Sequence, residues 1–226
     1  MEKKELELFV EELERKATLA EDMVELINLQ SLYNYHLEMN DTDYIVNEVF
    51  AQNDPEVSLE IGDTGIYVGL ESIKKFWDAR HKIQQMRGYL GCIMTDTPHI
   101  QVNKAGDHAK AIWYGFGPNS VPVDYPVRKS TGNRAEIVDT WLMGKYQNEY
   151  VKENGKWRIK KLQLLKYIQC PFDKSWNEAP DVYSYAPPKT ECVPDLPGHP
   201  YTPYDPNGNV LCLPFVDAPR GLFYDK

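Results

Sequence analysis

The apolar residues at the start of the chain recur with the period of an α-helix. Inward positions lie three or four residues apart at Leu26, Ile27, Gln30, Tyr33, Asn34 and Leu37. This spacing keeps them on one face and predicts an amphipathic helix over residues 23–37. Upstream, a second set of apolar residues with helical spacing lies among acidic residues, at Leu6, Phe9, Val10 and Leu13. It predicts a separate N-terminal helix that packs on the body or on another subunit.

Short elements follow this helical region. Residues 40–43 are Asn-Asp-Thr-Asp, which is typical of a turn and a helix cap, and a short helix is predicted over 44–50. Weak alternation broken by Gly62 and Gly65 predicts a hairpin between residues 56 and 67. A further helix is predicted over residues 70–81, with Ile73, Phe76 and Trp77 facing inward.

From residue 88 onward the hydrophobic period changes toward two. Four segments show it, over residues 94–102, 108–116, 137–150 and 157–168. Turn sequences rich in Gly, Asn, Asp and Pro separate them, so they are predicted to form four antiparallel strands joined as a meander. Helices followed by a long antiparallel sheet predict an α+β fold, with the helices on one face of a curved sheet.

The C-terminal part of the chain has a different composition. Eleven of the sixteen prolines lie between Pro171 and Pro219, which excludes long helices and central strands there. Many large aromatic residues accompany them, so we expect a Pro/Tyr-rich strap laid over the domain or over a neighbouring subunit. The predicted organisation is an N-terminal helical extension (1–20), a core domain (21–169) and this strap (170–226).

Composition and charge exclude several partners. The chain has 34 acidic and 25 basic residues and a formal net charge of -9, which disfavours nucleic acid and anionic membranes. No signal peptide and no membrane span are expected. The cysteines Cys92, Cys170, Cys192 and Cys212 are far apart, without the spacing of a zinc site. We therefore expect a reduced, cytoplasmic protein without a metal, although a Cys192–Cys212 disulfide stays open.

Several local motifs resemble one known family. They are the helix at 23–37 with Tyr33, the Asn40-Asp41 turn, and the segments 50–54, 69–76 and 153–159. In this order and spacing they resemble the SnoaL-like division of the nuclear transport factor 2-like superfamily, over residues 20–168. The resemblance implies a cone-shaped α+β barrel, in which N-terminal helices pack inside a strongly curved antiparallel sheet with a deep apolar pocket at its open end. Relatives include scytalone dehydratase, bile-acid 7α-dehydratase and ketosteroid isomerase.

The resemblance also implies a type of chemistry. These enzymes usually need no cofactor and work by proton transfer between pocket acids and bases. The chain is therefore expected to be a lyase, either a dehydratase or a retro-aldol carbon–carbon lyase, acting on a small aromatic or polycyclic hydroxylated substrate. Relatives commonly carry a histidine where this chain reads Gly91 to Met94. Its absence favours one alternative, a noncatalytic protein that binds an aromatic ligand. An isomerase with the same proton shuttle and an enzyme of the polyketide-cyclase type are also left open, because the sequence does not separate them from a lyase.

Three residues are the candidate catalytic groups. Tyr33 matches the pocket tyrosine of the family, and its alternative role is a core tyrosine bonded to backbone. Glu38 stands where relatives often carry an aspartate, although a carboxylate at a helix end is more often exposed. Asp139 lies in an apolar row of a predicted strand, where a buried acid is paired or protonated. Its alternative role is a structural salt bridge to Arg134, Lys145 or Lys161.

Other residues are expected to bind the substrate. Two of them are polar positions on the helix, Gln30 and Asn34. The others are aromatic and apolar positions predicted to line the cavity: Phe76, Trp77, Trp113, Trp141 and Met143. The expected partner is a small aromatic or polycyclic molecule. A homo-oligomer, either a dimer or a trimer, is also expected, because the acidic N-terminal stripe and the aromatic tail are suited to cover a second copy.

Overall fold

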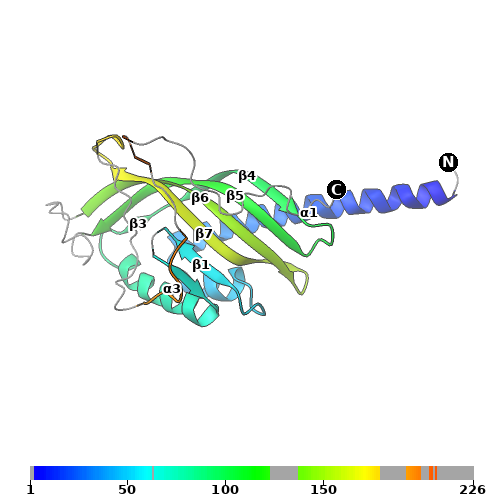
Figure 1. Cartoon of the computed structure of the whole chain (residues 1–226), viewed down its shortest axis with the longest axis horizontal. Helices are drawn as coiled ribbons and strands as arrows, with labels where there is room; N and C mark the ends of the chain where they lie inside the picture. The colour runs from blue at the N-terminus through cyan, green and yellow to red at the C-terminus, as the bar shows by residue number, and fades with distance from the viewer. Residues whose placement is uncertain are drawn as a thin grey trace.

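A long helix lies in the hollow of a curled sheet (Figure 1). The structure is a computed structural model and describes residues 3–62, 64–122, 137–178, 192–199, 204, 205 and 207. Its helical elements are α1 (Lys3–Glu38), α2 (Thr42–Tyr44), the π-helix η1 (Ile45–Val49) and α3 (Leu70–Gln84). Its strands are β1 (Ser58–Ile61), β2 (Ile66–Val68), β3 (Leu90–Gly91), β4 (Met94–Val102), β5 (His108–Pro122), β6 (Ile137–Glu153) and β7 (Lys156–Pro171).

Helix α1 runs without a break through the region where two helices were predicted. Residues 15–23 contain no glycine or proline, and most of them are good helix formers, so nothing in the backbone ends the helix there. The prediction of a separate N-terminal helix is therefore wrong. In Figure 1 the N-terminal half of α1 projects away from the body, while its C-terminal half lies against the sheet.

The predicted α+β fold and the four-stranded meander are confirmed. The sheet order is β2-β1-β7-β6-β5-β3, and β4 also pairs with β5. One pairing differs from the prediction, because β1 runs parallel to β7, with Leu59 opposite Leu162. The sheet is thus mixed. Register shifts in β4 and at two places between β6 and β7 bend the strands, as bulges do in strongly curved sheets.

A close backbone approach shapes one end of the sheet. A Cβ atom at Gly117 would lie 1.9 Å from the carbonyl oxygen of Cys92. Glycine is therefore required in this part of β5, where the segment between β3 and β4 crosses it. Strand β5 continues to Pro122 through residues that were predicted to form a loop.

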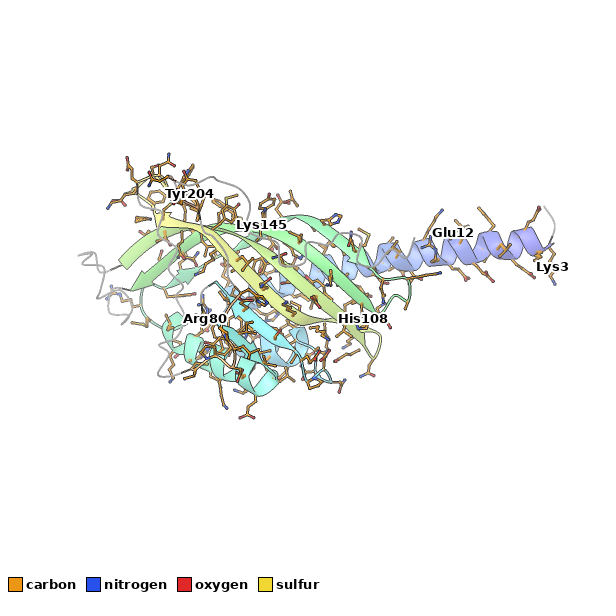
Figure 2. All side chains as sticks on the ribbon, in the orientation of Figure 1. Lys3, Glu12, Arg80, His108, Lys145 and Tyr204 are labelled. Atoms are coloured by element: carbon orange, nitrogen blue, oxygen red, sulfur yellow. The ribbon has the colours of Figure 1, made fainter. Side chains whose placement is uncertain are left out.

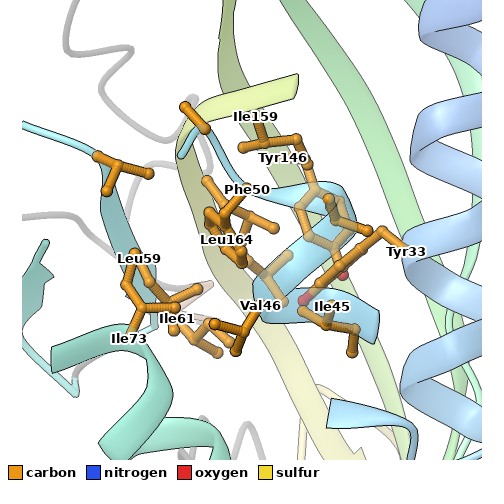
Figure 3. Packing of buried hydrophobic residues seen from close by; sticks show 14 of the residues in the cluster. Tyr33, Ile45, Val46, Phe50, Leu59, Ile61, Ile73, Tyr146, Ile159 and Leu164 are labelled. Carbon is orange, nitrogen blue, oxygen red and sulfur yellow. The ribbon is translucent and has the colours of Figure 1, made fainter. Parts of the chain in front are cut away.

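Apolar residues from α1, η1, α3 and the sheet form the core. Figure 3 shows part of this cluster, with Ile45 and Val46 of η1 packed between the sheet and α1. Tyr33 and Leu26 of α1 are fully buried in it, as is Trp77 of α3. The body-facing side of α1 thus fills the hollow of the sheet.

Part of the C-terminal strap lies on the chain's own domain. The backbone of Leu196 exchanges hydrogen bonds with Ile66 of β2, and the Asp195 carboxylate accepts from Ser72 Oγ at 2.5 Å. His199 contacts the buried Glu60 of β1 through an Nδ1–Oε2 distance of 2.7 Å. Residues 192–199 thus pack against β1, β2 and α3, and the remaining tail residues between 179 and 226, where the rest of the strap was predicted, lie largely outside the described residues.

Asp22 links α1 to the end of the sheet at the turn between β6 and β7. Its carboxylate is buried and accepts hydrogen bonds from Trp157 Nε1 at 2.8 Å and from Lys152 Nζ. A hydrogen bond to a charged group contributes more than a neutral one, and removing the acceptor leaves the indole N–H unpaired. This contact fixes where α1 enters the body.

We predict that Asp22→Ala lowers the free energy of unfolding by about 2 kcal/mol, because two donors lose their acceptor. Asp22→Asn keeps an acceptor for Trp157 and should lose about half as much. Urea unfolding at a fixed protein concentration measures both, with the exposed Glu25→Ala as the matched control. A loss for Asp22→Ala no larger than that of the control would contradict the anchoring role.

Candidate functional site

A small cavity lies between α1, α3 and the concave face of the sheet. Apolar side chains form much of its wall, and its polar groups come from Tyr33, Thr64, Arg80, Asn119, Tyr146 and Lys166. The space open to the centres of water-sized molecules is about 20 Å³. That is room for about one water molecule. The polar groups are the candidate functional site.

Two tyrosines meet at this cavity. Tyr33 of α1 and Tyr146 of β6 are both fully buried, and their rings pack edge to face with centroids 6.2 Å apart. Trp77 of α3 packs against Tyr33 at the same centroid distance. Figure 3 shows the two phenols reaching from the helix and the sheet toward one another, with their oxygens on the same side.

Four polar atoms at the cavity lack a hydrogen-bond partner of normal geometry among the described residues. Among the described residues, neither the Tyr33 nor the Tyr146 hydroxyl has a partner of normal geometry, although the two lie close enough to affect one another's pKa. Trp77 Nε1 and Asn119 Nδ2 are also buried without a partner. Unpaired buried polar groups are rare and cost stability. Four such groups around one cavity indicate a site that can bind a polar ligand.

Burial determines the protonation of both phenols. It raises the pKa of Tyr33 and of Tyr146 well above the ordinary value, and the nearby positive charge of Arg80 offsets this only in part. Both side chains are therefore protonated at neutral pH. Each can donate a hydrogen bond to an oxygen in the cavity, and neither is a base in its resting form.

Two basic side chains complete the polar wall. Arg80 of α3 donates from Nη2 to the Tyr89 hydroxyl at 3.2 Å. Lys166 of β7 is only 2% exposed, and its Nζ donates to Gln169 Oε1 at 3.4 Å. Positive charge beside hydrogen-bond donors favours an oxygen that carries or develops negative charge.

Gln30 is bonded inside the protein and does not line this cavity. Its Oε1 accepts from Asn148 Nδ2 at 2.8 Å and from the Tyr150 hydroxyl at 3.4 Å. Trp113 Nε1 donates to the same Tyr150 hydroxyl at 3.0 Å. Gln30 and Trp113 thus belong to a buried polar network that joins α1 to β5 and β6.

Three other predicted residues also take structural positions. Asn34 donates from Nδ2 to Thr95 Oγ1 at 2.8 Å. Phe76 is buried between Tyr67 and Trp77. Glu38 is exposed at the end of α1, where its charge adds to burial in raising the pKa of the Cys92 thiol. None of the three lines the cavity, whereas the predicted wall residue Trp77 does.

Asp139, Trp141 and Met143 do not face the cavity, and their predicted placement is wrong. Asp139 is exposed and accepts from Ser120 Oγ at 2.6 Å. Trp141 stacks on Phe116 with ring centroids 5.2 Å apart. The inward row of β6 consists of the even-numbered residues Leu142, Gly144, Tyr146, Asn148 and Tyr150, so the odd-numbered row lies on the outer face.

The error has a physical cause. The outer face of the sheet carries its own aromatic cluster, in which Trp141 also packs near Phe172 with ring centroids 5.7 Å apart. The apolar row of β6 that contains Trp141 therefore lies on the outer face of the sheet and is not the buried row. Both rows of β6 contain large side chains, and the strand's period alone gives no preference between them.

Sequence reasoning missed Tyr146, Lys166, Arg80 and Asn119. Lys166 had a usable signal, because it interrupts the apolar run Leu164, Leu165, Tyr167 and Ile168 in a strand. A lysine in such a run is buried only where something compensates it. The other three had no distinctive local pattern, since they meet only through the curl of the sheet.

The described ranges contain no candidate metal site and no candidate membrane-spanning helix. There, no three His, Cys, Asp or Glu side chains gather closely enough to hold a metal ion. None of the helices described has the length and apolar character that a membrane crossing requires.

Solved structures of other proteins share this fold. A protein of Novosphingobium aromaticivorans provisionally named a scytalone dehydratase is 18% identical, with a TM-score of 0.54 over 76% of this chain and 99% of its own. A hexachlorocyclohexane dehydrochlorinase of type 2 is 12% identical, with a TM-score of 0.55 over 71% of this chain and 95% of its own. These likenesses show the fold alone.

Sequence comparison identifies the family directly. The sequence model of the SnoaL-like domain matches residues 18–163, which is more than half of the chain and includes Tyr33, Arg80 and Tyr146. No curated protein matched the chain in sequence. The fold, the extent of the match and the helix-filled cone agree, and the chain belongs to the SnoaL-like domain family.

Proposed function

We propose that the chain is a cofactor-independent lyase, a dehydratase or a retro-aldol carbon–carbon lyase, acting on a small aromatic or polycyclic hydroxylated substrate. One observation carries the proposal. Two buried phenols, Tyr33 and Tyr146, converge on one cavity, and among the described residues neither hydroxyl has a hydrogen-bond partner of normal geometry. Paired donors of this kind stabilise an oxygen on which negative charge develops, as an enolate oxygen does.

Tyr33 and Tyr146 hold the carbonyl oxygen of the substrate in this mechanism. Lys166 takes the proton, because a lysine removed from water is able to act as a base once it is neutral. In a dehydration the proton leaves the carbon beside the carbonyl and goes to Lys166, and the enolate forms. The carbon–oxygen bond then breaks, and the hydroxide recovers the proton from Lys166 and departs as water.

Arg80 contributes through charge. It lies close enough to Tyr33 and Tyr146 to lower the pKa of both phenols against the effect of burial. The same positive charge stabilises an enolate held between them. A substrate ring needs far more than the space of one water molecule, so binding requires the cavity to widen.

A noncatalytic ligand-binding protein is the second candidate. It is favoured by one observation, that the described lining residues of this cavity include no carboxylate and no imidazole. Lys166 then serves to neutralise an anionic ligand. An isomerase differs from the lyase only in returning the proton to another carbon, and the same donors support it.

We predict that the protein acts on 3-hydroxy-1-phenylpropan-1-one, an aromatic β-hydroxy ketone chosen as a probe. In D₂O, deuterium should enter at the carbon beside the carbonyl. Dehydration would then give phenyl vinyl ketone, and retro-aldol cleavage would give acetophenone and formaldehyde. Saturable quenching of tryptophan fluorescence by the probe, without exchange or product, would contradict the lyase and support the binding protein.

We predict that Tyr33→Phe and Tyr146→Phe each lower the exchange rate by about 10²-fold, because each removes one donor from the developing oxyanion. Asp139→Asn changes an exposed carboxylate on the outer face and should stay within about twofold of the wild type. Circular dichroism checks that each variant is folded. Full activity in both tyrosine variants, or a large loss in Asp139→Asn, would refute the assigned site.

A further inference from the structure

Helix α1 has a second apolar face that points away from the body. Its residues are Leu6, Val10, Leu13, Ala17, Ala20, Val24 and Ile27, and all of them are exposed. Ile27 was predicted to face inward, and this placement is wrong. At 3.6 residues per turn this outer stripe lies about 150° around the helix from the buried residues Leu26, Tyr33 and Leu37. One helix thus has two apolar faces, and only one is covered by described residues.

The exposed side chains on this outer stripe are large. Leu6 is 47% exposed, Leu13 is 49% exposed and Val24 is 57% exposed. Figure 2 shows the projecting part of α1, which bears Lys3 and Glu12, with no other described segment beside it. An unsupported helical segment of this length is marginally stable in water, and a contiguous exposed apolar stripe marks an interaction site.

The outer stripe repeats every seven residues. Leu6, Leu13, Ala20 and Ile27 are spaced by seven, and so are Val10, Ala17 and Val24. These two series are the d and a positions of a coiled coil. Val10 at a lies between Leu6 and Leu13 at d, and this combination favours two strands in a parallel coiled coil.

We propose that the outer stripe of α1 pairs with the same stripe on a second copy of this chain, as a parallel two-stranded coiled coil. The two helices run side by side about a two-fold axis, and each residue of the stripe meets its own counterpart. The two bodies then lie on opposite sides of the helix pair, because each body covers the other face of its own α1. The cavity stays clear of the contact.

Charges beside the outer stripe favour the parallel arrangement. The e positions are Glu7, Glu14, Glu21 and Asn28, and the g positions are Phe9, Lys16 and Met23. In a parallel pair, g of one helix faces the next e of the other, so Lys16 meets the partner's Glu21 twice by symmetry. In an antiparallel pair the e positions face each other, and glutamates would oppose glutamates.

The first experiment measures the mass of the full chain at micromolar concentration by light scattering or sedimentation. We expect twice the chain mass of 26.1 kDa. Leu13→Glu should weaken dimerisation by more than about tenfold, because it buries a charge in the contact. Leu8→Glu is the matched control, since Leu8 is an equally exposed leucine on the opposite face of α1. A monomeric wild type would overturn the proposal.

The second experiment tests the orientation. Lys16→Glu should raise the dissociation constant by about fivefold, since two pairs become repulsive. The double variant with Glu21→Lys should restore it. These residues are five apart on one helix and do not face each other within a single chain. Circular dichroism controls for helix content, because Lys16 also pairs with Glu12 at 3.3 Å.

The following outcomes would contradict the proposed coiled coil. Equal dissociation by Leu13→Glu and Leu8→Glu, or a dimer that survives Leu13→Glu, would show that the copies meet elsewhere. Failure of the charge exchange to restore the Lys16→Glu dimer would rule out the parallel pairing. None of these residues lines the cavity, so the results are independent of the proposed chemistry.

Discussion

The burial of one face of α1 in the hollow of the curled sheet is the contact on which the site depends. It places Tyr33 of the helix against Tyr146 on the inner face of β6, although the two residues are far apart in sequence. The Asp22 contact with Trp157 and the Gln30 contact with Asn148 hold the same helix at two further points. A shift of α1 along its axis would separate the phenols.

The chemistry follows from what this packing leaves unpaired. Other buried polar groups in the core find partners within the chain, as Trp113 Nε1 and Asn148 Nδ2 do. Around the cavity the phenols of Tyr33 and Tyr146 do not. A fold loses stability by leaving such donors unpaired, and this loss is typical of sites that have been selected to bind something.

Much of the fold was predictable from periodicity, whereas only Tyr33 and Trp77 of the predicted site residues line the candidate cavity. Strand β4 has the predicted bounds, and the meander has the predicted order. The face of β6 was misassigned because Trp141 and Met143 form an apolar outer row as convincing as the inner one. Arg80, Tyr146 and Lys166 come together only through the curvature of the sheet, which a local pattern does not contain.

The central claim is that Tyr33 and Tyr146 donate to the same oxygen. A double-mutant cycle on the exchange rate tests it most directly, by comparing Tyr33→Phe, Tyr146→Phe and the double variant. We predict strong coupling, with the double variant far less impaired than the product of the two single losses. Independent, multiplicative losses would mean that the two phenols serve different atoms, and this result would contradict the shared site.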